Sequence, residues 1–432
     1  MRKRNPNLFR LVVCSCLMMF LPDKVSFPVL AGETGHRTPR AGEAYQAIVA
    51  GIEIEMEADE RMESKGIDVG FTWGKLDRSS SLAPYAGFFW DKKTAENKRR
   101  FYLILAGIYN FLDFGDSTWN RNGFEYLITW ENSTMPLTGE QVLNGREMEG
   151  TEIYTGYLQP GIGFGWRHIV HPHHPDNDLK LGLYYEPDYI YFIRAEDTSP
   201  AYALASDTFE HRLHFKMRLD AFERNLLEFR HSGWDFGTDL ICGCRQRWRD
   251  HGFEGQYSGE DTRQYILLKG FSTFCFGIPG LSERHRLLPS LYAAYSPDLL
   301  DRYSAAALGH DSNSEDANSL DFPVLYGVTS EEVLANQYFI ATLEYRLEVL
   351  FFLFLHFRVS GGFLNCQSLQ DPARPDSGIQ YIRERFRALD AGISSGFLGD
   401  SMISFDYGYN WDIKRGEKRG GYALNLDIIK QF

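Results

Sequence analysis

A two-residue alternation of apolar and polar side chains recurs along much of this chain. In "LKLGLYYEPDYIYFIR" (residues 179–194) leucine, tyrosine and isoleucine occupy most odd positions, and charged residues sit among the even positions. In "HRLHFKMRLDAF" (211–222) apolar residues alternate with histidine, arginine, lysine and aspartate. This is the period of a β-strand whose two faces meet different surroundings. A soluble β-sandwich or propeller also alternates, but a charge at nearly every second residue favours a barrel with a wet, charged lumen and a lipid-facing exterior.

Sixteen segments show this pattern, and even strand numbers are typical of single-chain bacterial barrels. The sequence therefore predicts an all-β fold, a transmembrane antiparallel β-barrel of about sixteen strands. Long and short connections alternate, and we expect the long ones outside the cell and the short ones in the periplasm. The predicted strands are residues 46–57, 67–76, 84–91, 101–113, 123–131, 152–168, 179–194, 210–222, 226–246, 263–277, 286–302, 334–348, 350–364, 384–397, 400–414 and 419–432.

The first 31 residues have the pattern of a secretory signal peptide. A basic start precedes the short apolar run "LVVCSCLMMFL", and "VLA" at 29–31 offers a cleavage site. A lipoprotein signal through Cys14 or Cys16 has less support, because little apolar sequence precedes these cysteines. The predicted organisation is a signal peptide at 1–31, a short periplasmic segment at 32–45 and an outer-membrane barrel at 46–432. The expected location is the outer membrane of a Gram-negative bacterium.

Composition argues against other classes of protein, such as helical membrane proteins and nucleic-acid-binding proteins. The chain has 32 Phe, 24 Tyr and 40 Gly, yet no run of 18 apolar residues follows residue 31, which argues against membrane helices. Removing residues 1–31 takes away five basic residues and one acidic residue, so the net charge changes from −13 to −17. Such a chain is a poor partner for nucleic acid. The pair Cys242 and Cys244 has no second pair to complete a zinc site.

The last strand ends the chain on an aromatic residue. An apolar row runs along one face and finishes at the terminus, as expected of a lipid-facing strand read by the barrel-assembly machinery during insertion. Outer-membrane lipid and lipopolysaccharide are the expected surroundings. The residues of this C-terminal insertion signal are Tyr422, Leu424, Leu426, Ile428 and Phe432.

The part of the chain from residue 322 onward resembles the barrel of the bacterial surface antigen family. That family includes outer-membrane insertases, two-partner secretion pores and the barrels of patatin-like autotransporters. The resemblance rests on "FPVLYGVTSEEVLANQYFIATLEYRL", on "LDAGISSGFLGDSMISFDYGYNW" and on the terminal Phe432. The matching residues are Tyr326 and Gly327 at a loop tip, Glu344, Tyr345 and Arg346 on a strand, and Asp406, Tyr407 and Gly408 on the closing hairpin.

The resemblance implies a loop that folds back into the lumen, with Tyr326 near the wall formed by 350–364 and 384–397. It also implies a role in inserting or exporting protein or lipid, in some members with separate periplasmic partner proteins. Two positions depart from the family pattern. Tyr326 stands where an arginine is expected, and Lys430 replaces an apolar residue near the end. A passive, porin-like solute channel is the alternative function.

No catalytic residue, metal or cofactor is expected. Residues 392–396, "GISSG", match the nucleophile motif of hydrolases around Ser394, but they fall inside a predicted strand, whereas that motif needs a strand, a sharp turn and a helix. "HPHHPDND" (171–178) contains metal-ligand types and is first of all a polar turn. The acidic loop 310–321 lacks calcium-site spacing. Lys216 and Arg218 are expected to face Glu186 and Asp188 inside the barrel, either in an open charged pore or in a salt-bridged, plugged lumen.

Overall fold

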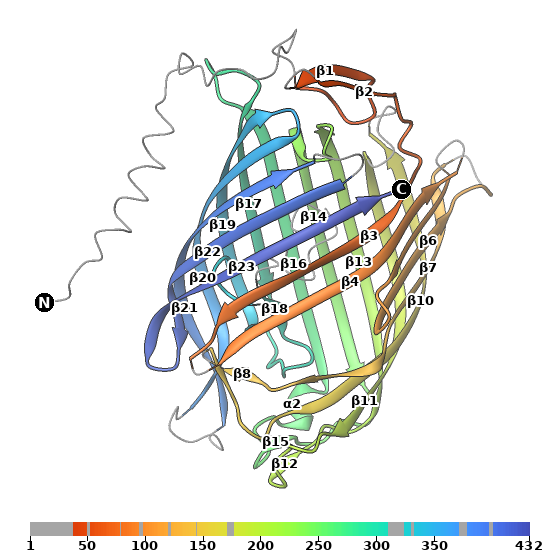
Figure 1. Cartoon of the computed structure of the whole chain (residues 1–432). Coiled ribbons are helices and arrows are strands. Elements are labelled where there is room, and N and C mark those ends of the chain that lie inside the picture. Colours follow the sequence, from red (N-terminus) through yellow and green to blue (C-terminus); the bar gives the residue numbers. More distant parts are fainter. Residues whose placement is uncertain are drawn as a thin grey trace, which may run out of the picture.

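The computed structural model is a closed, tilted β-barrel (Figure 1). It describes residues 38–49, 52–77, 79–94, 98–119, 122–143, 145–170, 177–309, 324–329, 332–370, 378–396 and 401–432. The predicted signal peptide, the histidines of 171–174 and the acidic loop 310–321 lie outside these residues. Among the described residues there is one helix, α2 (Gly259–Thr262), which has four residues. No helix in this part of the chain is long and apolar enough to cross a membrane.

Sixteen antiparallel strands form the wall, which confirms the predicted fold class. Consecutive strands pair, and the last strand pairs with the first to close the barrel. A short strand, β18 (Ala306–Leu308), extends the wall beside β19. The wall strands are β3 (Glu63–Lys75), β4 (Ser80–Lys93), β5 (Arg99–Leu105), β6 (Tyr109–Asp116), β7 (Phe124–Gly139), β10 (Ile153–Ile169), β11 (Asp178–Arg194), β13 (Thr208–Arg224), β14 (Arg230–Arg245), β16 (Gln264–Gly277), β17 (His285–Tyr295), β19 (Val333–Leu350), β20 (Leu353–Leu369), β21 (Ile379–Ser395), β22 (Ser401–Arg415) and β23 (Lys418–Gln431).

Two predicted strands were wrong, and the two errors cancel in the count. The segment 46–57 is a hairpin outside the wall, formed by β1 (Tyr45–Val49) and β2 (Ile52–Met56), whose arms of five residues each pair only with one another. The segment 101–113 is two wall strands, β5 and β6, which meet at a turn where Gly107 has φ +75°. The wall therefore begins at Glu63 and not at residue 46.

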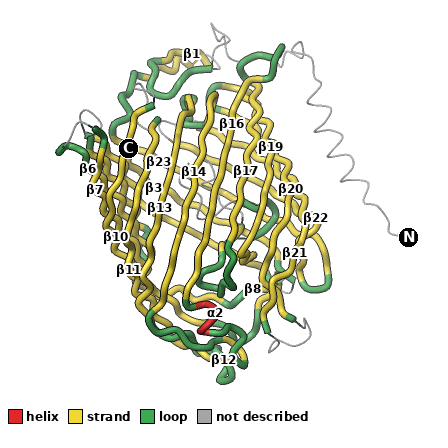
Figure 2. The backbone as a smooth tube through the Cα atoms, turned by 180° about the vertical axis from the view of Figure 1, so that it is seen from behind, coloured by secondary structure: helices red, strands yellow, loops and turns green. Residues whose placement is uncertain are grey.

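The two ends of the barrel differ. At the hairpin end, the upper end in Figure 1, lie the β1–β2 hairpin and the C-terminus. At the loop end lie the long connections, which carry the short elements β8 (Val142–Leu143), β9 (Arg146–Glu147), β12 (Tyr202–Ala203), β15 (Gly252–Phe253) and α2. The view from behind shows the same arrangement (Figure 2). Because the wall begins one strand later than predicted, the β3–β4 turn falls at the loop end rather than among the periplasmic turns.

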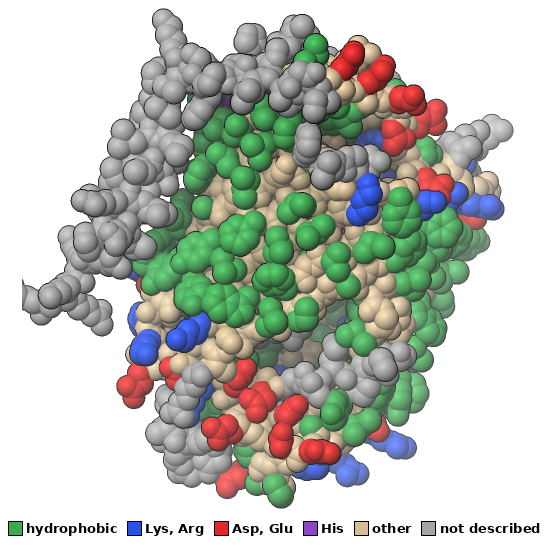
Figure 3. Space-filling model, in the orientation of Figure 1, with side chains coloured by type: hydrophobic (Ala, Val, Ile, Leu, Met, Phe, Trp, Pro, Cys, Tyr) green, Lys and Arg blue, Asp and Glu red, His purple; other side chains and the backbone are tan. Residues whose placement is uncertain are grey.

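Side chains alternate between an apolar exterior and a polar interior. On β23, Tyr422, Leu424 and Leu426 alternate with the fully buried inward residues Ala423 and Asn425. The exterior forms an apolar band between the two ends, and charged side chains gather beyond its edges (Figure 3). This is the surface that a lipid bilayer requires, and the strand alternation of the sequence produces it.

The closure seam is the pairing of β23 with β3. It runs from Ala423 opposite Gly74 to Gln431 opposite Gly66. Phe432 extends it, because its backbone N–H donates to the Lys65 carbonyl oxygen at 3.0 Å and its ring lies 6.4 Å from the ring of Phe88. The terminal residue therefore adds both a hydrogen bond and an aromatic contact at the edge of the apolar band.

Deleting Phe432 should lower the fraction of folded, heat-modifiable protein while synthesis stays normal, because the last strand loses its interfacial anchor. The measurement is the band shift between heated and unheated membrane samples. Phe274→Ala, which removes an outward ring of β16 that is 47% exposed, against 60% for Phe432, is the control and should assemble normally. Equal assembly of the deletion and the full-length chain would contradict an anchoring role.

Candidate functional site

Charged side chains inside the barrel are paired with one another. Arg218 donates two hydrogen bonds to Asp239, each 2.8 Å long. Asp188 accepts from Arg212 at 3.2 Å, and Glu186 lies 3.1 Å from the Nδ1 atom of His214. These residues share one lumenal surface with Lys216, which interacts electrostatically with Glu186, as the sequence predicted. The register sets Lys216 opposite Gly182 and Arg218 opposite Lys180. The hydrogen-bond partners therefore differ from the prediction: Glu186 is paired with His214, Asp188 with Arg212, and Arg218 with Asp239.

The loop end is closed by a buried cluster around Arg245. This side chain is fully buried, and it donates to Glu210 and to Asp301 at 2.6 Å each. Its guanidinium carbon lies 4.2 Å from the centre of the Trp248 ring. Burial alone would raise the pKa of the Asp301 carboxyl, but Arg245 and His251 hold that pKa below its usual range. The connections after β14 and β17 thus fold over the lumen and are held there by charge.

The connection before β19 enters the lumen. Its described part, residues 324–329, is named here the lumen loop. Leu325 and Val328 are fully buried, and the backbone N–H of Leu325 donates to the Gly309 carbonyl oxygen at 2.8 Å. The apolar residues of the lumen loop pack against inward side chains of three neighbouring wall strands, Tyr338 and Ile340 of β19, Leu364 of β20 and Phe386 of β21.

The tip of the lumen loop is Tyr326-Gly327. Gly327 has φ +76°, and a Cβ atom on it would lie 2.4 Å from the backbone nitrogen of Asn410 in β22. Only glycine combines this backbone conformation with so close an approach. Gly408 faces the same contact, because a Cβ atom there would lie 2.5 Å from the Gly327 nitrogen. The two glycines let the loop lie directly on the wall.

Tyr326 packs against a buried charge cluster on the wall. Its ring centre lies 5.8 Å from the guanidinium carbon of Arg358 in β20. Arg358 donates to Asp390 at 2.6 Å, to Asp406 at 2.5 Å and to Glu344 at 3.1 Å. Burial raises the pKa of the Tyr326 phenol well above its ordinary value, so the ring remains neutral. The positive charge that the sequence lacks at position 326 is present next to it, on Arg358.

The other members of the predicted site divide between the two faces of the wall. Glu344 also accepts from Arg346, at 2.8 Å, inside the barrel. Tyr345 and Tyr407 are directed outward; the Tyr345 hydroxyl lies 2.6 Å from the Nδ1 atom of His285, and Tyr407 is exposed. The structure thus brings Tyr326, Glu344, Arg346 and Asp406 into one lumenal region and leaves the two tyrosines on the exterior.

A second arginine, Arg415, holds the base of the lumen loop. It donates to both carboxylate oxygens of Glu332, at 2.8 Å each, and to the Gly327 carbonyl oxygen at 3.1 Å. Glu332 in turn accepts from the backbone N–H of Thr329 at 2.8 Å. Sequence reasoning missed Arg415 and Arg358, since both are inward arginines of wall strands and nothing local distinguishes them from other lumenal charges.

The lumen loop contacts the first wall strand and is linked to the last one through β22. On the β3 side, a Cβ atom on Gly74 would lie 2.3 Å from the Thr329 side chain. Arg415 of β22, which donates to the Gly327 carbonyl oxygen of the loop, also donates to the Tyr422 carbonyl oxygen of β23 at 3.4 Å. The lumen loop therefore touches β3 and β22, and Arg415 connects it to β23.

The N-terminal segment covers part of the hairpin end. The Thr38 hydroxyl donates to Glu348 at 2.6 Å, and the backbone N–H of Ala41 donates to the Arg224 carbonyl oxygen at 3.1 Å. The ring of Tyr45 lies 5.1 Å from that of Phe351 in the β19–β20 turn. Both ends of the lumen are thus crossed by chain segments.

Ser394 lies within β21, where it is buried and paired with Phe354 and Ser404 of the adjacent strands. It does not occupy the strand–turn–helix junction that a nucleophile motif requires. Cys242 and Cys244 are free thiols on the outward face of β14. Asp178, the last residue of the 171–178 motif, is paired with Arg167 at 2.5 Å. The described part of the chain contains no cluster of three metal-ligand side chains.

No family model and no curated protein sequence matches the chain. Among solved structures, it is similar to BamA from Haemophilus ducreyi lacking POTRA domains 1–3, with TM-score 0.52 and 11% identity over 92% of this chain and 76% of that one. It is also similar to CdiB from Escherichia coli, with TM-score 0.50 and 14% identity over 92% of this chain and 68% of that one. At such low identity these likenesses show a shared barrel fold.

Cysteines at positions 326 and 388 should form a disulfide, because Tyr326 and Ala388 pack in one buried cluster. The test uses a chain in which Cys242, Cys244, Cys275 and Cys366 are replaced by alanine, with cross-linked peptides detected by mass spectrometry. Position 341, on the outward face of β19, is the control partner and should not cross-link. Free labelling of position 326 by a bulky thiol reagent from outside whole cells would contradict the inserted loop.

Arg415→Ala should loosen the lumen loop, because it leaves Glu332 buried without its cation, at a cost of about 3–5 kcal/mol. The measurement is the labelling rate of a cysteine at position 326. Arg415→Ala combined with Glu332→Ala should recover part of the protection, since no charge is then left unpaired. Arg419→Ala is the matched control, because that side chain is 60% exposed on the adjacent turn. Equal labelling of the Arg415 and Arg419 variants would contradict the clamp.

Proposed function

We propose that this chain is an outer-membrane β-barrel that assists the insertion or export of protein or lipid across the outer membrane of a Gram-negative bacterium. Its hairpin end would face the periplasm and its loop end the cell surface. The apolar exterior and wall strands of up to 18 residues support a membrane location. The signal-peptide pattern of residues 1–31 agrees with export of the chain to the outer membrane.

The observation that carries the proposal is the contact of the lumen loop with β3 and with β22, whose Arg415 connects the loop to β23. A loop connected in this way to both sides of the closure seam can couple its own movement to the separation of the first and last strands. When β23 and β3 separate, their strand edges lose backbone hydrogen bonds. A client, meaning the protein that is being inserted, could form hydrogen bonds with these edges in their place.

The same geometry argues against a passive solute channel. Several charged lumenal side chains are fully buried, among them Asp235, Asp239 and Asp390. In an open pore such groups would be hydrated and would interact with passing ions. Here they are neutralised by arginines, and the lumen loop and the Arg245 cluster occupy the interior. A resting state with a closed lumen fits a gated barrel better than a porin.

The function can be tested with purified protein in lipid vesicles. Vesicles that contain the chain should accelerate the folding of a second, urea-unfolded outer-membrane barrel relative to vesicles with an equal amount of a small inert barrel. In planar bilayers the same protein should be mostly silent, because the lumen loop and the Arg245 cluster occupy the interior. Steady conductance without any acceleration of folding would support the solute-channel alternative and contradict the proposal.

A further inference from the structure

The outward face of β21 changes from apolar to basic halfway along the strand. Toward the hairpin end the outward residues are Leu389, Ala391 and Ile393, and toward the loop end they are Arg387, Arg385 and Arg383. The three arginines alternate along one strand, so they point to the same side, and all three are exposed. Membrane barrels place apolar side chains on this surface, which makes three consecutive outward arginines unusual.

The level of this change coincides with an aromatic belt. Leu389 is opposite Tyr409 of β22, and Trp411 follows two residues later. On the adjoining strands the rings of Trp73 and Tyr422 lie 5.6 Å apart. Aromatic belts mark the depth of the lipid headgroups. The arginines therefore begin where hydrocarbon ends and headgroups begin, on the loop-end side.

Within the described part of the chain, two of the three arginines are left available to a ligand. Arg387 is paired with Asp412, at 2.9 and 3.0 Å. Arg383 lies with its guanidinium carbon 4.3 Å from the centre of the Phe363 ring. Among the described residues neither Arg383 nor Arg385 has an ion-pair partner within 4.0 Å. Both line a surface hollow of about 610 Å³ together with Gly362 and Phe363.

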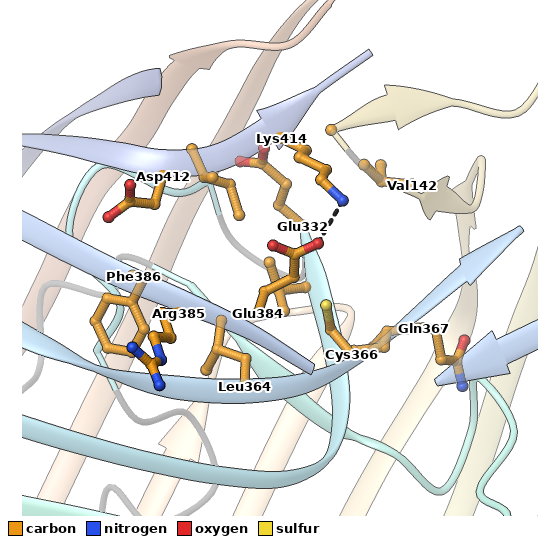
Figure 4. A pocket seen from close by; sticks show the side chains of 14 residues that line it. Val142, Glu332, Leu364, Cys366, Gln367, Glu384, Arg385, Phe386, Asp412 and Lys414 are labelled. Atoms are coloured by element: carbon orange, nitrogen blue, oxygen red, sulfur yellow. Dashed lines mark hydrogen bonds and ion pairs between the residues drawn. The ribbon is translucent and has the colours of Figure 1, made fainter. Parts of the chain in front are cut away.

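The wall is open beside this face. Pairing of β21 with β22 stops at Ala388 opposite Asn410, because the Asn410 side chain accepts the backbone N–H groups of Asp412 and Ile413 and turns β22 away. Beyond that point the Lys414–Glu384 ion pair bridges the strands (Figure 4). A second pocket lies in this gap, and Arg385 also lines it. The basic face is thus bordered by β20 on one side and, toward β22, by a strand edge without backbone pairing.

We propose that this face binds lipopolysaccharide, with Arg383 and Arg385 contacting the phosphate groups of its lipid A. Residues two apart on a strand are about 7 Å from each other, so the two guanidinium groups can each contact a phosphate of one multiply phosphorylated headgroup. Beside them, Phe363, which is opposite Arg385 in the register, and its stacked neighbour Phe339 offer an apolar surface to the acyl chains. Arginine suits this role because it is always charged and binds phosphate through two donors. The inference rests on the outer-membrane location proposed above, since the loop end then meets the lipopolysaccharide leaflet.

The test measures how much lipid A stays bound to the folded full-length protein, using native mass spectrometry after reconstitution with lipid A and phosphatidylglycerol. The double variant Arg383→Gln, Arg385→Gln should retain about tenfold less lipid A, because it loses two charge-assisted contacts. The double variant Lys92→Gln, Arg99→Gln is the matched control. It removes the same charge from exposed ion pairs at the hairpin end and should retain lipid A like the wild type.

Unchanged retention in the arginine variant, an equal loss in the control, or equal binding of phosphatidylglycerol would overturn the proposal. A photoreactive lipid A on the wild-type chain provides a second measurement that needs no variant: labelled peptides should come from β20 and β21, and labelling only elsewhere would also overturn it. Neither readout depends on folding of a client barrel. Lipid A binding without client folding would therefore contradict the proposed function alone, and the reverse result would contradict this inference alone.

Discussion

A chain in lipid must satisfy every backbone hydrogen bond within itself, and the pairing of β23 with β3 meets that requirement here. Without it, two strand edges would face hydrocarbon. The other features follow from closure. A closed wall has one face toward lipid and one toward the lumen, so each strand needs the two-residue alternation. The final residue matters because it extends the pairing that completes the ring.

Closure creates a second requirement, inside the barrel. Inward charges lie close together in a confined space, and a buried charge without a partner is costly. The barrel meets this cost with pairs that cross strand boundaries, such as Arg218 with Asp239 and Arg358 with Asp390 and Asp406. The Arg358 cluster also provides a surface on which the lumen loop packs. The same side chains therefore neutralise charge in the lumen and hold the loop that fills it.

The alternation was sufficient to predict the fold class, because period and hydrogen-bond closure are properties of the whole chain, whereas the predicted strand number is right only because two errors cancel. The alternation could not distinguish a wall strand from the β1–β2 hairpin, since both alternate. It also predicted β5 and β6 as one strand, because the turn between them depends on a single glycine with positive φ. Register also escaped prediction: the partners of Glu186 and Asp188 depend on which residues oppose each other, and a shift of two residues keeps every side chain on its face. The contacts of Arg358 and Arg415 with the lumen loop could be identified only from the structure, because they join residues that are far apart in the sequence.

The two arginines that contact the lumen loop differ in what they would lose if the loop withdrew. Arg358 would keep all three of its carboxylate partners on the wall and would lose only the ring of Tyr326. Arg415 would have to give up Glu332 or carry it along. Movement of the tip would also break the hydrogen bond from Arg415 to the Gly327 carbonyl oxygen, but it would leave the Arg415–Glu332 ion pair at the base intact. This arrangement describes a hinge with its pivot near Glu332. A rotation of the tip about that pivot would leave no lumenal charge without its partner. The barrel could therefore change between closed and open states without a large electrostatic barrier.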